Sequence, residues 1–179
     1  MNKLTLMARC ALVCGAMLAL SPAVLAAEVM NPNDPCLKRV FEKTTSTGRW
    51  LVKECAGKVE HHFKVEFRDA KLQQYSAMFS DDDPSSIVGE NYMLVAPDTL
   101  ALDLMAERGG RVFLVHPVGG TNELSTVRVD YMNPDEGGKF NLKKTGNNIR
   151  LVTNEDDVTV VVDAEGRLSK MSKPRKKKP

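Results

Sequence analysis

The sequence contains few of the residues that mark common enzyme classes. Its 179 residues include three histidines, four cysteines and a single tryptophan. It has no Gly-x-Ser-x-Gly, no Ser-x-x-Lys and no Cys-x-x-Cys. The chain therefore lacks the local signatures of an α/β-hydrolase, a β-lactamase-type acylase and a thioredoxin-like redox protein. We predict that it is not an enzyme and that it binds no cofactor.

Long hydrophobic runs are also missing, apart from one close to the start. Residues 11–20 carry no charge, follow Lys3 and Arg9, and precede the small residue Ala26. The run is too short to span a hydrocarbon core of about 30 Å. Its basic leader, apolar centre and small-residue end predict a secretory signal peptide over residues 1–26. We expect a periplasmic or secreted protein that is not transmembrane.

The signal peptide removes two of the four cysteines, Cys10 and Cys14, from the mature chain. Cys36 and Cys55 remain, and no histidine stands at metal-ligand spacing from either of them. In an exported protein such a pair is expected to be oxidised. We predict a disulfide between Cys36 and Cys55, which contributes about 3 kcal/mol on the chain-entropy account.

Neither sign of charge is in clear excess, with 25 basic and 23 acidic residues. The C-terminal segment 173–179 concentrates bases, namely Lys173, Arg175, Lys176, Lys177 and Lys178. The body, residues 27–172, is therefore acidic. We expect the tail to be disordered, and either to touch an anionic envelope surface or only to keep the chain soluble. It has no interleaved aromatic residues, so we expect no nucleic-acid partner.

Apolar residues alternate with polar ones over much of the body. Phe63, Val65 and Phe67 take every second position in residues 61–68, with charged residues between them. This period of two is typical of strands with one wet face, and turn residues recur at the spacing of a sandwich or barrel. We predict one all-β domain over residues 27–172, mainly an antiparallel meander of about ten strands.

One short helix is expected before the strands. Asp34 and Pro35 are typical of an N-cap and a first helical position. Leu37, Val40 and Phe41 follow at the spacing of a single helical face. The sequence therefore predicts a short N-terminal helix that carries Cys36 in its first turn.

The histidines and acidic clusters do not have metal-ligand spacing. His61 and His62 are neighbours in an expected strand, so their side chains should point to opposite faces. His116 stands apart, at an expected strand end. The acidic clusters 81–83 and 155–157 lack the alternation and central glycine of a calcium loop. We predict no metal site.

The function expected for such a chain is binding. The longest connections are candidate partner-binding loops, with Asp81, Asp82, Asp83, His116, Asn122, Asp135 and Glu136 as candidate residues. The leading hypothesis is an exported protein-binding module, an inhibitor or immunity-type protein that blocks a wall-degrading enzyme or a delivered toxin. The alternatives are a carrier with a cavity for a small apolar ligand, and an accessory subunit of an envelope assembly.

Overall fold

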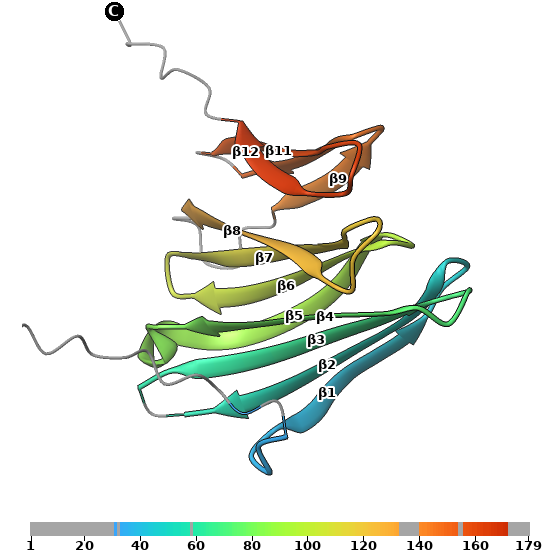
Figure 1. Cartoon of the computed structure of the whole chain (residues 1–179). Helices are drawn as coiled ribbons and strands as arrows, with labels where there is room; N and C mark the ends of the chain where they lie inside the picture. Colours follow the sequence, from blue (N-terminus) through green and yellow to red (C-terminus); the bar gives the residue numbers. More distant parts are fainter. Residues whose placement is uncertain (1–30, 32, 58, 133–139, 154–155, 172–179) are drawn as a thin grey trace, which may run out of the picture.

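The protein consists of three antiparallel sheets stacked as layers (Figure 1). The structure is a computed structural model that describes residues 31, 33–57, 59–132, 140–153 and 156–171. The predicted signal peptide, the predicted basic tail, Asp135 and Glu136 lie outside these residues. Within them, no helix is both long and apolar enough to cross a membrane.

The first sheet is a meander in the order β1-β2-β3-β4. Its strands are β1 (Lys38–Thr44), β2 (Gly48–Ala56), β3 (His61–Asp69) and β4 (Gln74–Asp81). Along β3, Phe63, Val65 and Phe67 are buried, while Lys64 and Glu66 are half-buried on the opposite face. The alternation predicted for this segment is therefore confirmed.

The predicted N-terminal helix is wrong. The segment begins with a turn in which the Leu37 amide donates to the Asp34 carbonyl at 3.0 Å, and β1 starts at the next residue. A register shift between Arg39 and Phe41 then turns the Phe41 ring towards the core. Pairing with β2 and burial of this ring outweigh a helical face of only three residues, because short isolated helices are marginal.

The middle sheet follows a short 3₁₀ turn, η1 (Pro84–Ser86), and has the order β5-β6-β7-β8. Its strands are β5 (Ile87–Ala96), β6 (Thr99–Ala106), β7 (Gly109–Pro117) and β8 (Leu124–Met132). Leu100 and Leu102 belong to the core shared with the first sheet, and Ala101 to the core shared with the third. This sheet is covered on both faces, which explains its continuous apolar runs.

The third sheet has the order β12-β11-β10-β9. Its strands are β9 (Asn141–Thr145), β10 (Asn148–Val152), β11 (Asp157–Val162) and β12 (Leu168–Met171). Ile149, Leu151 and Val160 face the middle sheet and complete the second core. The all-β, antiparallel prediction is confirmed, with three layers in place of a two-layer sandwich or a closed barrel.

The predicted disulfide is present in the described part of the chain. Cys36 and Cys55 have their Cα atoms 5.2 Å apart and are bonded, which confirms the pairing. The bridge ties the segment before β1 to the end of β2, where Cys55 follows Glu54. A disulfide is compatible with an extracellular or periplasmic location.

Candidate functional site

Asp81 does not lie in an exposed loop, which corrects the expectation for this residue. It is the last residue of β4 and is fully buried. Arg111 of β7 donates to the Asp81 carboxylate, and also to Asp83 at 2.8 Å. Arg128 of β8 lies 3.2 Å from Asp82 and 3.8 Å from Asp81. We call these five residues the arginine–aspartate cluster; its cations explain how a carboxylate can be buried here.

The carboxylates of this cluster are already engaged within the chain. Asp82 and Asp83 are exposed, yet both are paired with an arginine. Hydrogen bonds from the Ser86 and Ser85 side chains and the Arg111 charge hold the pKa of Asp83 below its usual range. A partner would have to compete with these contacts, so the cluster suits a structural role better than a free acidic loop.

His116 lies at the end of β7 and is largely buried, which corrects its assignment to a partner-binding loop. Its Nδ1 lies 2.9 Å from the Pro117 carbonyl oxygen, and its Nε2 lies 3.5 Å from Asp98. Lys144 of β9 donates to Asp98 at 3.0 Å. His116, followed by Lys144, holds the pKa of Asp98 well below its usual range. The contacts join the middle sheet to the third.

A cavity of about 360 Å³ opens beside His116, between the middle and third sheets. Its lining includes Asp98, Lys144 and Glu165 together with turn glycines. Gly166 adopts φ +90°, and a Cβ there would stand 2.3 Å from the Pro117 carbonyl oxygen. The charged residues in this lining do not favour the hypothesis of an apolar-ligand carrier.

Asn122 is exposed on the connection between β7 and β8, where the sequence predicts a loop. Its carbonyl accepts a hydrogen bond from the Ser76 amide at 3.0 Å. The Gln73 side chain reaches its side-chain oxygen at 3.4 Å. The connection is therefore held against the start of β4, and its role in partner binding stays a prediction.

A second polar cluster lies between the first two sheets, and no sequence motif predicts it. Glu54 of β2, His61 of β3, and Glu90 and Tyr92 of β5 meet there. His61 Nε2 lies 3.3 Å from Glu54 Oε2, and Nδ1 lies 3.4 Å from Glu90 Oε1. The Tyr92 hydroxyl lies 2.6 Å from Glu90 and 3.2 Å from Glu54. We call these residues the acidic histidine cluster.

The two carboxylates of this cluster, Glu54 and Glu90, lie close together and are partly shielded from water. Burial, followed by the neighbouring Glu90, raises the pKa of Glu54. Burial and the same two carboxylates raise the pKa of Tyr92, so its hydroxyl keeps its proton and donates. The cluster thus places two carboxylates beside one imidazole. Carboxylates and imidazoles are common metal ligands in proteins.

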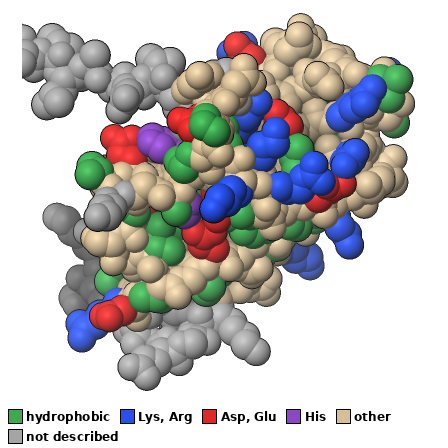
Figure 2. All heavy atoms as spheres, turned by 90° about the horizontal axis from the view of Figure 1, so that it is seen from below, with side chains coloured by type: hydrophobic (Ala, Val, Ile, Leu, Met, Phe, Trp, Pro, Cys, Tyr) green, Lys and Arg blue, Asp and Glu red, His purple; other side chains and the backbone are tan. Residues whose placement is uncertain are grey.

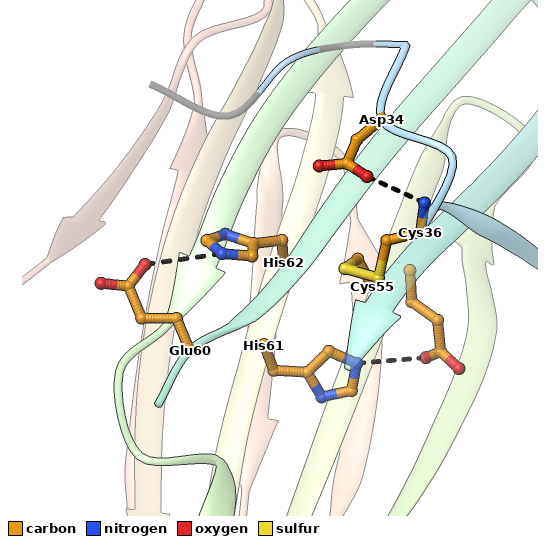
Figure 3. Close-up of a disulfide and its surroundings, with 7 residues drawn as sticks. Asp34, Cys36, Cys55, Glu60, His61 and His62 are labelled. Carbon is orange, nitrogen blue, oxygen red and sulfur yellow. Dashed lines mark hydrogen bonds and ion pairs between the residues drawn. A yellow bond between two sulfur atoms is a disulfide. The ribbon is translucent and has the colours of Figure 1, made fainter. Parts of the chain in front are cut away.

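His61 and His62 separate to opposite faces of β3, as predicted. His61 is only 5% exposed, whereas the outward His62 lies 3.7 Å from Glu60. Figure 3 shows the two rings on different sides of the strand, with the disulfide beside them. The alternation predicts that His61 points inward. It does not predict the contact with Glu90 of β5, because β3 and β5 belong to different sheets.

The outer face of the first sheet is rich in basic residues. Strand register places these side chains on one side of the sheet: Arg39, Arg49, Lys53, Lys64 and Arg68. We call this surface the basic face, and Figure 2 looks onto it and shows Lys and Arg side chains across it. Arg49 lies directly opposite Arg68, and Lys53 directly opposite Lys64.

Acidic residues only partly neutralise the basic face. Glu42 pairs with Arg39 at 2.6 Å and also with Arg49. Glu66 lies 2.7 Å from Lys64 and 3.9 Å from Lys53. Cations therefore outnumber anions on this face, in contrast to the acidic composition of the body as a whole.

Comparison with protein-family models found no match, and searches of curated proteins and of solved structures also found none.

Proposed function

We propose that this protein is an exported binding module that recognises an acidic surface of a partner protein through its basic face. The partner is a wall-degrading enzyme or a delivered toxin, which the module blocks in the manner of an inhibitor or immunity protein. The observation that carries the proposal is the register of β2 and β3, which sets Arg49 opposite Arg68 and Lys53 opposite Lys64. Like charges directly opposite each other destabilise a sheet.

An acidic partner would remove this repulsion on binding. The acidic side chains of the partner would add to the negative charge that Glu42 and Glu66 supply on the basic face. Complementary potentials of this kind speed association and reject partners with the wrong sign of charge. The repulsion that the free sheet tolerates thus becomes part of the driving force for recognition.

A protein partner suits the basic face better than a simple polyanion. Leu51 is half-buried on this side of the sheet, and Met78, which lies opposite Lys64, is 37% exposed. Apolar side chains among charged ones are typical of protein interfaces, where a less polar centre is surrounded by a polar rim. The predicted tail would add long-range attraction of the same sign.

The proposal is tested with untagged residues 27–179 immobilised and exposed to envelope extract and to competitor-cell lysate. The captured protein is identified by mass spectrometry, and its Kd is then measured against increasing NaCl. The variant R49E/R68E reverses two exposed charges on the basic face. We expect its affinity to fall about 100-fold, because like charges across an interface cost several kcal/mol.

The matched control is K143E, which reverses an exposed charge on the outer face of the third sheet. We expect it to bind like the natural chain and to keep the same salt dependence. Equal loss in both variants, or no loss in R49E/R68E, would refute the role of the basic face. Retention by phosphatidylglycerol vesicles with no captured protein would show that the partner is a membrane surface instead.

A further inference from the structure

We propose that the acidic histidine cluster binds one divalent transition-metal ion through His61, Glu54 and Glu90. One ligand atom from each of these residues lies within 4.8 Å of the others. Metal bonds of about 2.0–2.2 Å to nitrogen and oxygen place neighbouring ligand atoms about 3–3.5 Å apart. The contact of 3.3 Å between His61 Nε2 and Glu54 Oε2 already has this spacing. Glu90 Oε1 lies 3.4 Å from the other ring nitrogen, Nδ1, so the Glu90 side chain would turn to share an ion bound at Nε2.

The second observation is an unsatisfied atom of a buried side chain. His61 Nε2 is buried and makes no hydrogen bond within the described residues, although Glu54 Oε2 lies 3.3 Å away. A buried polar atom without a hydrogen bond is costly and uncommon in folded proteins. A metal ion would use the nitrogen lone pair that is otherwise left without a partner.

Charge balance favours a dication. Glu54 and Glu90 bring two carboxylates into the same space, and His61 alone cannot neutralise both. A divalent ion with a neutral imidazole would make the centre neutral. An imidazole nitrogen beside carboxylates suits ions such as Zn²⁺ better than Ca²⁺ or Mg²⁺, which prefer oxygen ligands only.

Tyr92 is a positioning residue in this site. Its hydroxyl contacts both carboxylates, at 2.6 Å and 3.2 Å, and so holds them in place beside His61. Such outer-shell hydrogen bonds typically change metal affinity by about 10–100-fold. Three protein ligands leave one position of a tetrahedral ion open to water.

Binding would also fasten two layers of the fold together. Glu54 and His61 come from the first sheet, and Glu90 comes from the middle sheet. The ion would therefore stabilise the native state, by a free energy that rises with the logarithm of its concentration above the Kd. This role is independent of the basic face and of any partner protein.

The test uses untagged residues 27–179, treated with EDTA, dialysed and titrated with Zn²⁺ by calorimetry. We expect one equivalent to bind with micromolar or tighter affinity, and Tm to rise with added Zn²⁺. H61Q, E54Q and E90Q should each lose at least tenfold in affinity and most of the Tm response. Y92F should bind about 10–100-fold more weakly.

H62Q is the matched control, because it removes the adjacent histidine on the opposite face, next to Glu60. It should bind Zn²⁺ like the natural chain. Absence of binding by the natural chain would overturn the proposal, as would binding lost in H62Q but kept in H61Q. If H61Q fails to fold, E54Q and E90Q decide the question, since glutamine keeps the shape of glutamate. None of these outcomes depends on capture of a partner protein.

Discussion

Two ionic clusters lie side by side between the first and middle sheets and are balanced in opposite ways. The register of β3 and β4 places His61 directly opposite Asp81. Asp81 meets the permanent charges of Arg111 and Arg128, whereas Glu54 and Glu90 share the single imidazole of His61. The buried Asp81 is therefore met by two permanent cations within the chain, whereas the other cluster leaves negative charge that an added cation would balance.

The comparison separates a structural ion network from a candidate binding site between the same two sheets. Removal of a cation should damage the first cluster, because a buried carboxylate would be left alone. Removal of a carboxylate should relieve the second, because two acids repel each other there. Substitutions of opposite expected sign can therefore test the distinction directly.

The largest effect is expected at Arg111. R111M keeps much of the side-chain volume but removes the cation that contacts Asp81 and Asp83. We expect the free energy of unfolding to fall by about 3–5 kcal/mol, as when one partner of a buried pair is lost. Urea denaturation followed by circular dichroism measures it. K143E provides the exposed control, and a loss below about 1 kcal/mol would mean that the cluster is not structural.

Asp103 extends the comparison to a buried carboxylate that accepts a hydrogen bond from the Tyr131 hydroxyl at 2.9 Å. Burial raises the pKa of Asp103 to about 6. Because the native state binds this proton more tightly than the unfolded state does, the contribution of Asp103 to stability is largest at low pH. This contribution falls as pH rises from about 4 to about 6.

D103N should remove this loss, because asparagine carries no charge and its oxygen still accepts from Tyr131. We expect a gain of about 2 kcal/mol over the natural chain at pH 7.5 and none at pH 4. Urea denaturation at both values checks it. A gain of equal size at the two values would show that the charge of Asp103 is not the cause.

The smallest effect is expected in the acidic histidine cluster itself. In EDTA at pH 7.5, E90Q should raise the free energy of unfolding by about 1 kcal/mol, because it removes a charge that repels Glu54. The glutamine oxygen can still accept from Tyr92. E60Q, at the exposed neighbour of His62, should change stability by less than about 0.5 kcal/mol. A clear loss in E90Q would mean that His61 balances both carboxylates by itself.

The sequence correctly predicts several local features of the chain. The inward Phe63, Val65 and Phe67 follow from period-two alternation. The pairing of Cys36 with Cys55 follows from the cysteine count once a signal peptide is assumed. The opposite orientation of His61 and His62 follows from their adjacency in a strand. The first and third predictions depend only on residues that are close together in the sequence. The second has only one possible outcome, because two cysteines allow a single intramolecular pairing.

The errors came where distant segments meet. Residues 37–41 fit a helical face, but β2 was available as a partner and Phe41 could be buried by a bulge. The acidic run at residues 81–83 looked like a solvated loop, but Arg111 and Arg128 lie across the interface from it. No spacing in the sequence indicates that β2 pairs with β1, or that these two arginines contact residues 81–83.

Alternation and turn residues are enough to predict an antiparallel all-β chain, because short turns between consecutive strands can join them only in antiparallel pairs. They do not decide that the sheets form three layers, nor which charges face one another across a layer. Glu54, His61 and Glu90 form one cluster only because the middle sheet packs on the first. The pairing of a buried carboxylate with a cation depends on distances of a few ångströms across that interface. Tertiary packing alone therefore decides which buried carboxylates lie next to a cation of the same chain.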